Sequence, residues 1–175
     1  LLRTARSAGI VNSPSDADGA TRHLPLAIEY DGKLYPTLSL QLACDYLGVS
    51  MDSVIIKPGH VILPVHGGDI RIPVDPQARM LLNFSGPIDT LERYSYIQLL
   101  HDYNRSLKDG TKSILENLRG KIVFIGHTAT GSVDSRIMPF SNFYPAVGMH
   151  ATALGNILDR DLIREAPAGL NILAI

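Results

Sequence analysis

One apolar run limits the possible folds more than any other feature of this sequence. Residues 121–126 read Lys-Ile-Val-Phe-Ile-Gly without interruption. A strand with one face in water alternates apolar and polar residues, whereas a strand covered on both faces is apolar throughout. The run therefore predicts a strand at the centre of a parallel or mixed sheet, and we expect Val123 and Ile125 to be buried there.

Strands and helices alternate along the rest of the chain. Turn sequences such as Asp-Gly, Gly-Gly and Gly-Pro separate short β-like runs at 8–12, 22–30, 54–56, 61–63, 70–74 and 80–84. Helices are expected at 37–47, 96–107, 113–118 and 149–160. Thr37 can cap the first helix and Gly48 can end it. The pattern predicts an α/β domain with a mixed, largely parallel central sheet and helices on its faces.

The composition suits one globular domain. Of the 175 residues, 45% are hydrophobic and 19% charged, which is ordinary for a soluble core-forming chain. The 16 basic and 17 acidic residues leave no basic excess, so we expect no binding to nucleic acid. The single cysteine, Cys44, excludes an internal disulfide, and its helical apolar surroundings predict a core position. No histidines stand at metal-ligand spacing, and we predict neither a metal nor a cofactor.

No apolar stretch of the sequence is long enough to span a membrane. Residues 169–175 are nevertheless almost entirely apolar. Two interpretations stay open: these residues begin a membrane helix, or they belong to a C-terminal helix of the core.

The polar loop after the apolar run is the main candidate for a ligand site. It reads Gly-His-Thr-Ala-Thr-Gly-Ser-Val-Asp over 126–134 and follows the expected carboxyl end of a strand, where α/β sheets bind ligands. His150 falls in the first turn of the next expected helix, whose free amides favour a polar or anionic ligand. We therefore predict a ligand site formed by His127, Thr128, Thr130, Asp134 and His150. The alternative is structural: the hydroxyls satisfy backbone groups, and His150 is a hydrogen-bonded core residue.

Two other motifs are weaker. Ser132, His150 and Asp134 can be written as a hydrolase triad, but the sequence has no nucleophile elbow. Asp16 and Asp18 stand as at the start of a calcium loop, but the remaining ligands of such a loop are missing. Asp18 followed by glycine predicts a turn instead, and we expect stability to be independent of calcium.

Three ordered stretches carry a resemblance to a known family. The first is Ala8-Gly9-Ile10-Val11-Asn12 with Asp16, Asp18-Gly19, Arg22 and Pro25-Leu26. The second is Gly120-Lys121-Ile122-Val123-Phe124-Ile125-Gly126 with Thr128-Ala129, Gly131 and Asp134. The third is Pro145, Gly148, His150-Ala151 and Ile157-Leu158, followed by Leu162 and Pro167. In this order they resemble the type-2 CHASE domain, the extracellular sensory domain associated with bacterial cyclases, histidine kinases and serine/threonine kinases.

The chain departs from the family pattern in two places. The family usually begins with a tryptophan-containing segment after a membrane helix, and this chain has no tryptophan. We therefore expect a fragment that lacks an N-terminal segment of the sheet. The family also tends to show Thr-Pro after the aspartate, where this chain has Met138-Pro139.

The resemblance implies a single extracytoplasmic sensory domain over 1–175, on the periplasmic or extracellular face of the bacterial cytoplasmic membrane. It implies membrane anchoring in the full-length protein and a cytoplasmic kinase or cyclase output, including two-component systems, and it supplies no catalytic residues. We expect an unidentified small-molecule or protein ligand, and a homodimer. A hydrolase that uses the 127–134 loop with His150, and a structural dimerisation spacer, are the alternatives.

Overall fold

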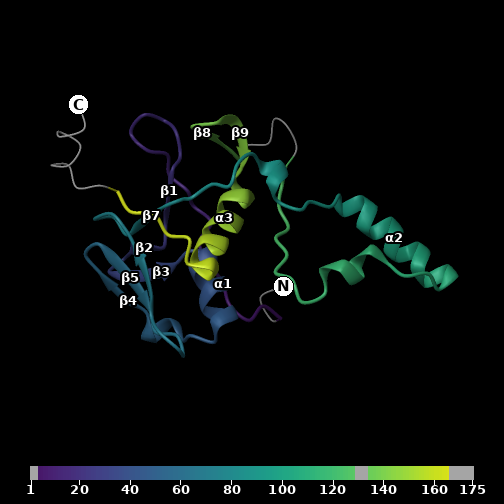
Figure 1. Ribbon diagram of the computed structural model, residues 1–175, viewed down its shortest axis with the longest axis horizontal. Helices are drawn as coiled ribbons and strands as arrows, with labels where there is room; N and C mark the ends of the chain where they lie inside the picture. Colours follow the sequence, from purple (N-terminus) through teal and green to yellow (C-terminus); the bar gives the residue numbers. More distant parts are fainter. Residues whose placement is uncertain (1–3, 129–133, 166–175) are drawn as a thin grey trace.

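The computed structural model describes residues 4–128 and 134–165 (Figure 1). In chain order the elements are β1 (His23–Pro25), β2 (Ala27–Tyr30), β3 (Lys33–Pro36), α1 (Leu38–Leu47), η1 (Met51–Ser53), β4 (Ile55–Lys57), β5 (His60–Leu63), β6 (Ile70–Pro73), β7 (Arg79–Leu81), η2 (Ile88–Thr90), α2 (Tyr96–Asp109), η3 (Ile114–Leu118), β8 (Ser135–Met138), β9 (Ser141–Pro145) and α3 (Ala146–Asp159).

The described strands form small antiparallel sheets: β1 with β7, β2 with β3, β4 with β5 and β6, and β8 with β9. The mixture of helices and strands is confirmed, but the largely parallel central sheet is wrong. Short turns connect most paired strands, as between β2 and β3, where Asp31 and Gly32 both have positive φ (51° and 70°). A short connection permits only antiparallel pairing, because a parallel pair needs a long crossover.

Helices α1 and α3 pack against each other and supply much of the core. Their buried apolar residues recur every three or four positions, as one face of a helix requires: Leu40, Ala43 and Cys44 in α1, and Met149, Ala153 and Ile157 in α3. The core position predicted for Cys44 is confirmed, and burial raises the pKa of its thiol to about 11. Each large apolar side chain buried here contributes roughly 1.5–3 kcal/mol to folding.

The apolar run 121–126 is not a strand, and the prediction of a buried central strand is wrong. Val123 is 48% exposed and Ile125 is 81% exposed. Phe124 is partly buried against the core, and Gly126 lies so close to α3 that an added Cβ would come within 2.7 Å of Val147. Within the described residues, no strand pairs with the run. It therefore rests on α3 as irregular chain with much of its apolar surface in solvent.

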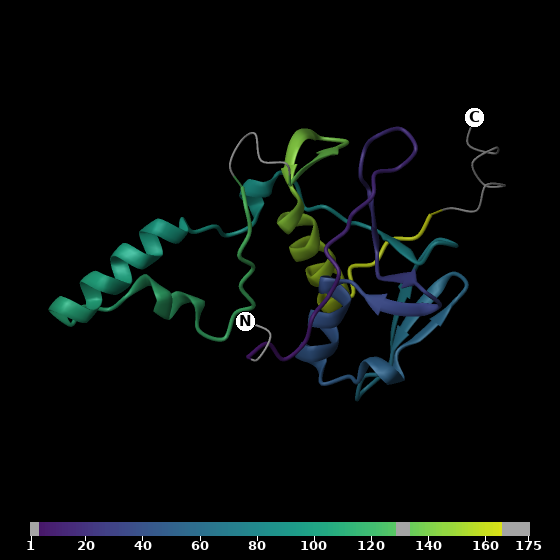
Figure 2. The ribbon, with the colours of Figure 1, turned by 180° about the vertical axis from the view of Figure 1, so that it is seen from behind.

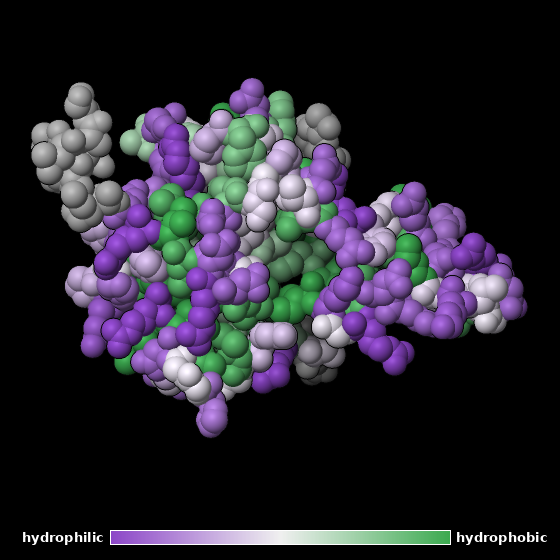
Figure 3. All heavy atoms as spheres, in the orientation of Figure 1, coloured by the Kyte–Doolittle hydropathy of each residue, from purple (hydrophilic) through white to green (hydrophobic). Residues whose placement is uncertain are grey.

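Helix α2 and η3 form an arm (residues 96–118) that projects from the body in both ribbon views (Figures 1 and 2). No residue of α2 is buried, although its apolar side chains follow one face at helical spacing: Tyr96, Leu100, Tyr103 and Leu107. Asp102 joins the two elements, since its carboxylate accepts hydrogen bonds of 2.7 Å from the Ser113 hydroxyl and the Ile114 amide. Figure 3 shows hydrophobic residues at the surface of the arm and of the body beside it.

The helix predictions agree with the structure more closely than the strand predictions. The ranges 37–47, 96–107 and 113–118 correspond to α1, α2 and η3, and α3 begins at Ala146, somewhat before the predicted start. Thr37 occupies the N-cap of α1, but its hydroxyl donates to the Leu26 carbonyl (3.1 Å) and not to the first amides of the helix. Strands β3, β8 and β9 lie in segments where no strand was predicted.

Candidate functional site

His150 is buried among α1, α3 and the N-terminal segment. Its Nδ1 lies 2.9 Å from Ser39 Oγ, and its Nε2 lies 3.3 Å from the carbonyl oxygen of Val11. A carbonyl only accepts, so Nε2 carries the hydrogen, and in the neutral ring Nδ1 is an acceptor facing the Ser39 hydroxyl. The same hydroxyl donates to the His150 carbonyl oxygen at 3.2 Å. Burial lowers the pKa of His150, against weaker opposing effects of the Val11 carbonyl and of the charge on Asp134. These contacts are typical of a neutral, hydrogen-bonded histidine in the core. This is the structural role that the sequence offered as the alternative to a ligand site.

None of the other predicted site residues forms a described hydrogen bond with the His150 ring. His127 and Thr128 are exposed beyond the apolar run. Asp134 immediately precedes β8, and its carbonyl accepts a hydrogen bond of 2.9 Å from the amide of Ala146. Thr130, like Ser132 of the hydrolase alternative, lies outside the described residues. A ligand site at this loop therefore stays a prediction.

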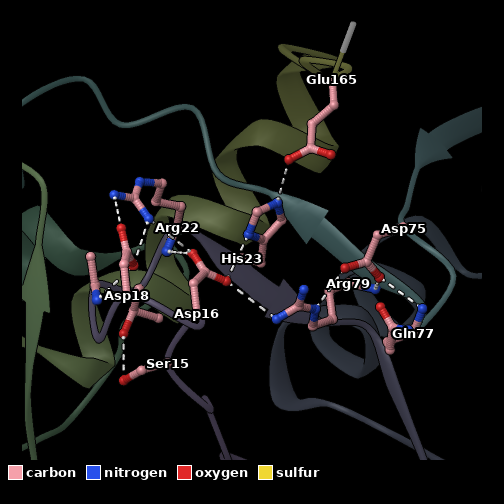
Figure 4. Close-up of polar contacts among 11 residues, drawn as sticks. Ser15, Asp16, Asp18, Arg22, His23, Asp75, Gln77, Arg79 and Glu165 are labelled. Carbon is pink, nitrogen blue, oxygen red and sulfur yellow. Dashed lines mark hydrogen bonds and ion pairs between the residues drawn. The ribbon is translucent and has the colours of Figure 1, made fainter. Parts of the chain in front are cut away.

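A different group of charged side chains, the Asp16 cluster, consists of Asp16, Arg22, His23, Asp75 and Arg79 (Figure 4). The Asp16 carboxylate is only 12% exposed. It accepts hydrogen bonds from the Arg22 amide (3.0 Å) and from Arg79 Nη1 (3.2 Å), and it faces His23 Nδ1 at 2.9 Å. Arg79 also donates from Nε to Asp75 at 2.6 Å. The cluster thus ties the turn that precedes β1 to β7 and to the end of β6.

The turn predicted around Asp18 and Gly19 is confirmed. Gly19 has a φ of 84°, and its amide donates to the Asp16 carbonyl (2.9 Å). Arg22 donates to both oxygens of Asp18, at 3.1 and 2.7 Å, and together with the amide of Ala20 it lowers the pKa of Asp18 to about 2. Both carboxylates are therefore engaged by protein donors. Among the described residues, no group of three or more acidic, histidine or cysteine side chains is placed to hold a metal ion.

His23 connects the Asp16 cluster to residues 163–165. Its Nδ1 faces Asp16, and its Nε2 lies 3.1 Å from Glu165 Oε1. Ionised carboxylates only accept, so both contacts form together only when both ring nitrogens carry hydrogen. Beside this bridge, Arg164 donates to His60 Nε2 at 3.1 Å. Side chains from β1 and β5 therefore hold residues 163–165 against the body.

A pocket of about 140 Å³ lies between residues 163–165 and the strands. Its opposite wall includes His23, Val74, Asp75, Arg79 and Leu81. A second hollow, of about 550 Å³, is lined by Ala27, Ile28, Glu29, Gln77 and Arg79 among others. The smaller pocket is the better candidate site, because charged groups from several elements converge there on apolar side chains, which is the usual make-up of a ligand site.

Sequence reasoning missed this pocket because its parts are distant along the chain. Asp16, Asp18 and Arg22 were noticed as a turn and as part of the family pattern. Arg79, however, is 63 positions from Asp16, and Glu165 is 142 positions from His23. No spacing rule links such positions. The available signal was limited to charged residues beside short strands.

Comparison with known families agrees with the resemblance in the sequence. The family model of the CHASE2 domain matches residues 2–175, essentially the whole chain. Comparisons with curated proteins and with solved structures give no match. In the described part of the chain, no helix has both the length and the apolar character required to cross a membrane. The chain belongs to the CHASE2 family, whose members are extracellular sensory domains and not catalytic domains.

Proposed function

We propose that this chain is the extracytoplasmic input domain of a membrane-anchored bacterial receptor. Membership of the CHASE2 family supports a sensory role outside the cytoplasm. The proposal includes a ligand, and a cytoplasmic output that is a histidine kinase, a serine/threonine kinase or an adenylate cyclase. It also includes a membrane helix that begins within residues 169–175, which lie outside the described residues.

One observation supports a mechanism in which ligand binding shifts the receptor between two states. The pocket beside the Asp16 cluster has one wall made of Ile163, Arg164 and Glu165 and another made of strand residues such as His23 and Leu81. A ligand in this pocket touches the segment and the body at the same time. Its binding energy therefore differs between receptor states in which residues 163–165 lie at different distances from the strands.

Such a difference is sufficient for signalling. A ligand shifts an equilibrium between two states only by the ratio of its affinities for them. The polar contacts that hold the segment in the described part of the chain are those of His23 with Glu165 and of Arg164 with His60. A free-energy change of about 1–2 kcal/mol in this region changes the ratio of the two states by a factor of about 5–30.

The test compares two substitutions in the full-length receptor with its output assay. Glu165→Gln removes the carboxylate charge that faces His23, and we expect ligand-free output to change about fivefold or more. Glu92→Gln is the matched control, because Glu92 is a similarly exposed carboxylate that pairs with Lys121 near the arm. Equal output from both variants and the unmodified receptor would contradict the proposed coupling.

The homodimer expected from the sequence is part of this proposal. The exposed apolar face of α2 offers surface for association, since large apolar patches on soluble domains often mark interaction sites. Sedimentation velocity of the 175-residue chain over a range of concentrations measures the oligomeric state directly. Monomer at every concentration would remove the dimer from the proposal and leave the sensory role in place.

A further inference from the structure

We infer that the pocket against residues 163–165 binds a small monocarboxylate anion, with its carboxylate paired to Arg164 and a short apolar tail inside the pocket. The inference rests on the proposed function, because it names the ligand class of the pocket that the sensor uses. Its basis is the charge, the size and the apolar walls of that pocket.

The charges around the pocket are paired except at Arg164. Asp75 is paired with Arg79, and Glu165 faces His23. Among the described residues, no carboxylate forms an ion pair with Arg164, which donates a hydrogen bond to His60 Nε2. A guanidinium without a carboxylate partner on a residue that lines a pocket favours an anion. Carboxylates match its planar donor geometry, since they accept two parallel N–H bonds.

The acidic residues of the pocket make a cationic ligand less favourable than an anionic one. An amine ligand would need a carboxylate with free acceptor capacity. Asp75 already accepts from the Gln77 amide, the Arg79 amide and Arg79 Nε, at 2.9, 2.9 and 2.6 Å. Glu165 faces His23, which is itself held by Asp16. A cationic ligand could therefore pair only with Glu165, whose Oε1 already faces His23 and whose side chain is 64% exposed.

The apolar walls of the pocket favour a ligand with an apolar tail, and the volume of the pocket limits the size of that ligand. Pro73, Val74, Leu81 and Ile163 supply apolar surface. The volume of about 140 Å³ is close to that of an engineered cavity of ~150 Å³ that holds benzene, so about six non-hydrogen atoms fit. Butyrate has this size, with a carboxylate head and an apolar tail. A dicarboxylate would place a second, unpaired charge against the apolar wall.

The experiment measures the melting temperature of the 175-residue chain with sodium butyrate, sodium phosphate, butylammonium chloride or sodium chloride at equal ionic strength. Butyrate is expected to raise the melting temperature saturably, with a dissociation constant on the order of 1 mM for so small a ligand. Arg164→Gln should weaken butyrate binding about tenfold or more, because one charge-assisted pair is lost. Arg71→Gln is the matched control, since Arg71 is exposed on β6 and does not line the pocket.

Each outcome decides the inference. A butyrate shift that disappears in Arg164→Gln and persists in Arg71→Gln supports it. No butyrate shift, or a shift that survives in Arg164→Gln, overturns it. A shift with butylammonium or phosphate but not with butyrate overturns the ligand class and leaves the pocket as the proposed sensor site. If butyrate binds through Arg164 yet leaves the output of the full-length receptor unchanged, the binding inference stands and the proposed function fails.

Discussion

For a single residue such as His150, the neighbours found in three dimensions decide between a functional and a structural role. Helical spacing correctly indicates that His150 points inward, alongside Leu154 and Ile157. Its partner Ser39 is 111 positions away in α1, and no local pattern reveals that contact. The polar loop 127–134 looked like its partner because it precedes the helix in sequence. Among the described residues of the loop, Asp134 acts on His150 through its charge.

The lowered pKa of His150 predicts a loss of stability in acid. The folded protein resists protonation of this ring, whereas the unfolded chain accepts a proton near the ordinary value of about 6.5. The unfolded state therefore binds more protons as pH falls, and the His150 contribution to the free energy of unfolding is complete above about pH 6.5 and declines below it. Histidine NMR should show a pKa of His150 below the ordinary value and, in the neutral ring, the Nε2–H tautomer. A His150 pKa at or above the ordinary value of about 6.5 in the folded protein would contradict this assignment.

The Asp16 cluster gives a second prediction for single residues. Asp16→Ala leaves the Arg22 amide and Arg79 Nη1 without their acceptor, so the free energy of unfolding should fall by about 1–3 kcal/mol. Asp18→Ala should cost less, because the Asp18 side chain is 58% exposed and pairs with Arg22 at the surface. Urea denaturation with and without calcium measures both effects. A calcium-dependent stabilisation that Asp16→Ala abolishes would show that the turn is a cation site.

At the scale of secondary-structure elements, local signals predict helices and fail for the sheets. The range 37–47 contains the whole signal for α1: a capping position, apolar residues at helical spacing and Gly48, which has a φ of 69°. Pairing of β1 with β7, in contrast, joins Leu24 to Met80 across a long stretch of chain. The apolar run 121–126 shows the same limit, since an apolar run indicates a buried strand only if partner strands exist.

The exposure of the apolar run predicts an asymmetry between two similar substitutions. Ile125→Asp places a charge at a position that is 81% exposed, so the free energy of unfolding should change by no more than about 0.5 kcal/mol. Ile157→Asp buries an unpaired charge in α3 and should prevent folding. Circular dichroism and urea denaturation distinguish the two. An Ile125→Asp protein that fails to fold would show that the run is covered in solution.

For the molecule as a whole, the structure divides into a body that buries its apolar residues and an arm that does not. The body contains α1, α3 and the paired strands. Residues 163–165, which line the pocket, lie on the side away from the arm (Figure 1). Composition predicted one globular unit, but it contains no information about how apolar residues divide between interior and surface. The ligand that we propose for the pocket would therefore act on the body and on residues 163–165, whereas the proposed association of two copies would engage the arm.

This division predicts two levels of protection in amide hydrogen exchange. Helix α2 buries no residue and is held mainly to η3, so it should open locally at small cost, whereas α1 and α3 should open only with the whole body. We expect α2 amides to exchange about a hundredfold faster than those of α3, which corresponds to a difference of ~3 kcal/mol in opening free energy. Equal protection of α2 and α3 at every protein concentration would contradict an independent arm. Protection of α2 that grows with concentration, while that of α3 stays constant, would instead show that a second copy of the chain covers the apolar face of the arm.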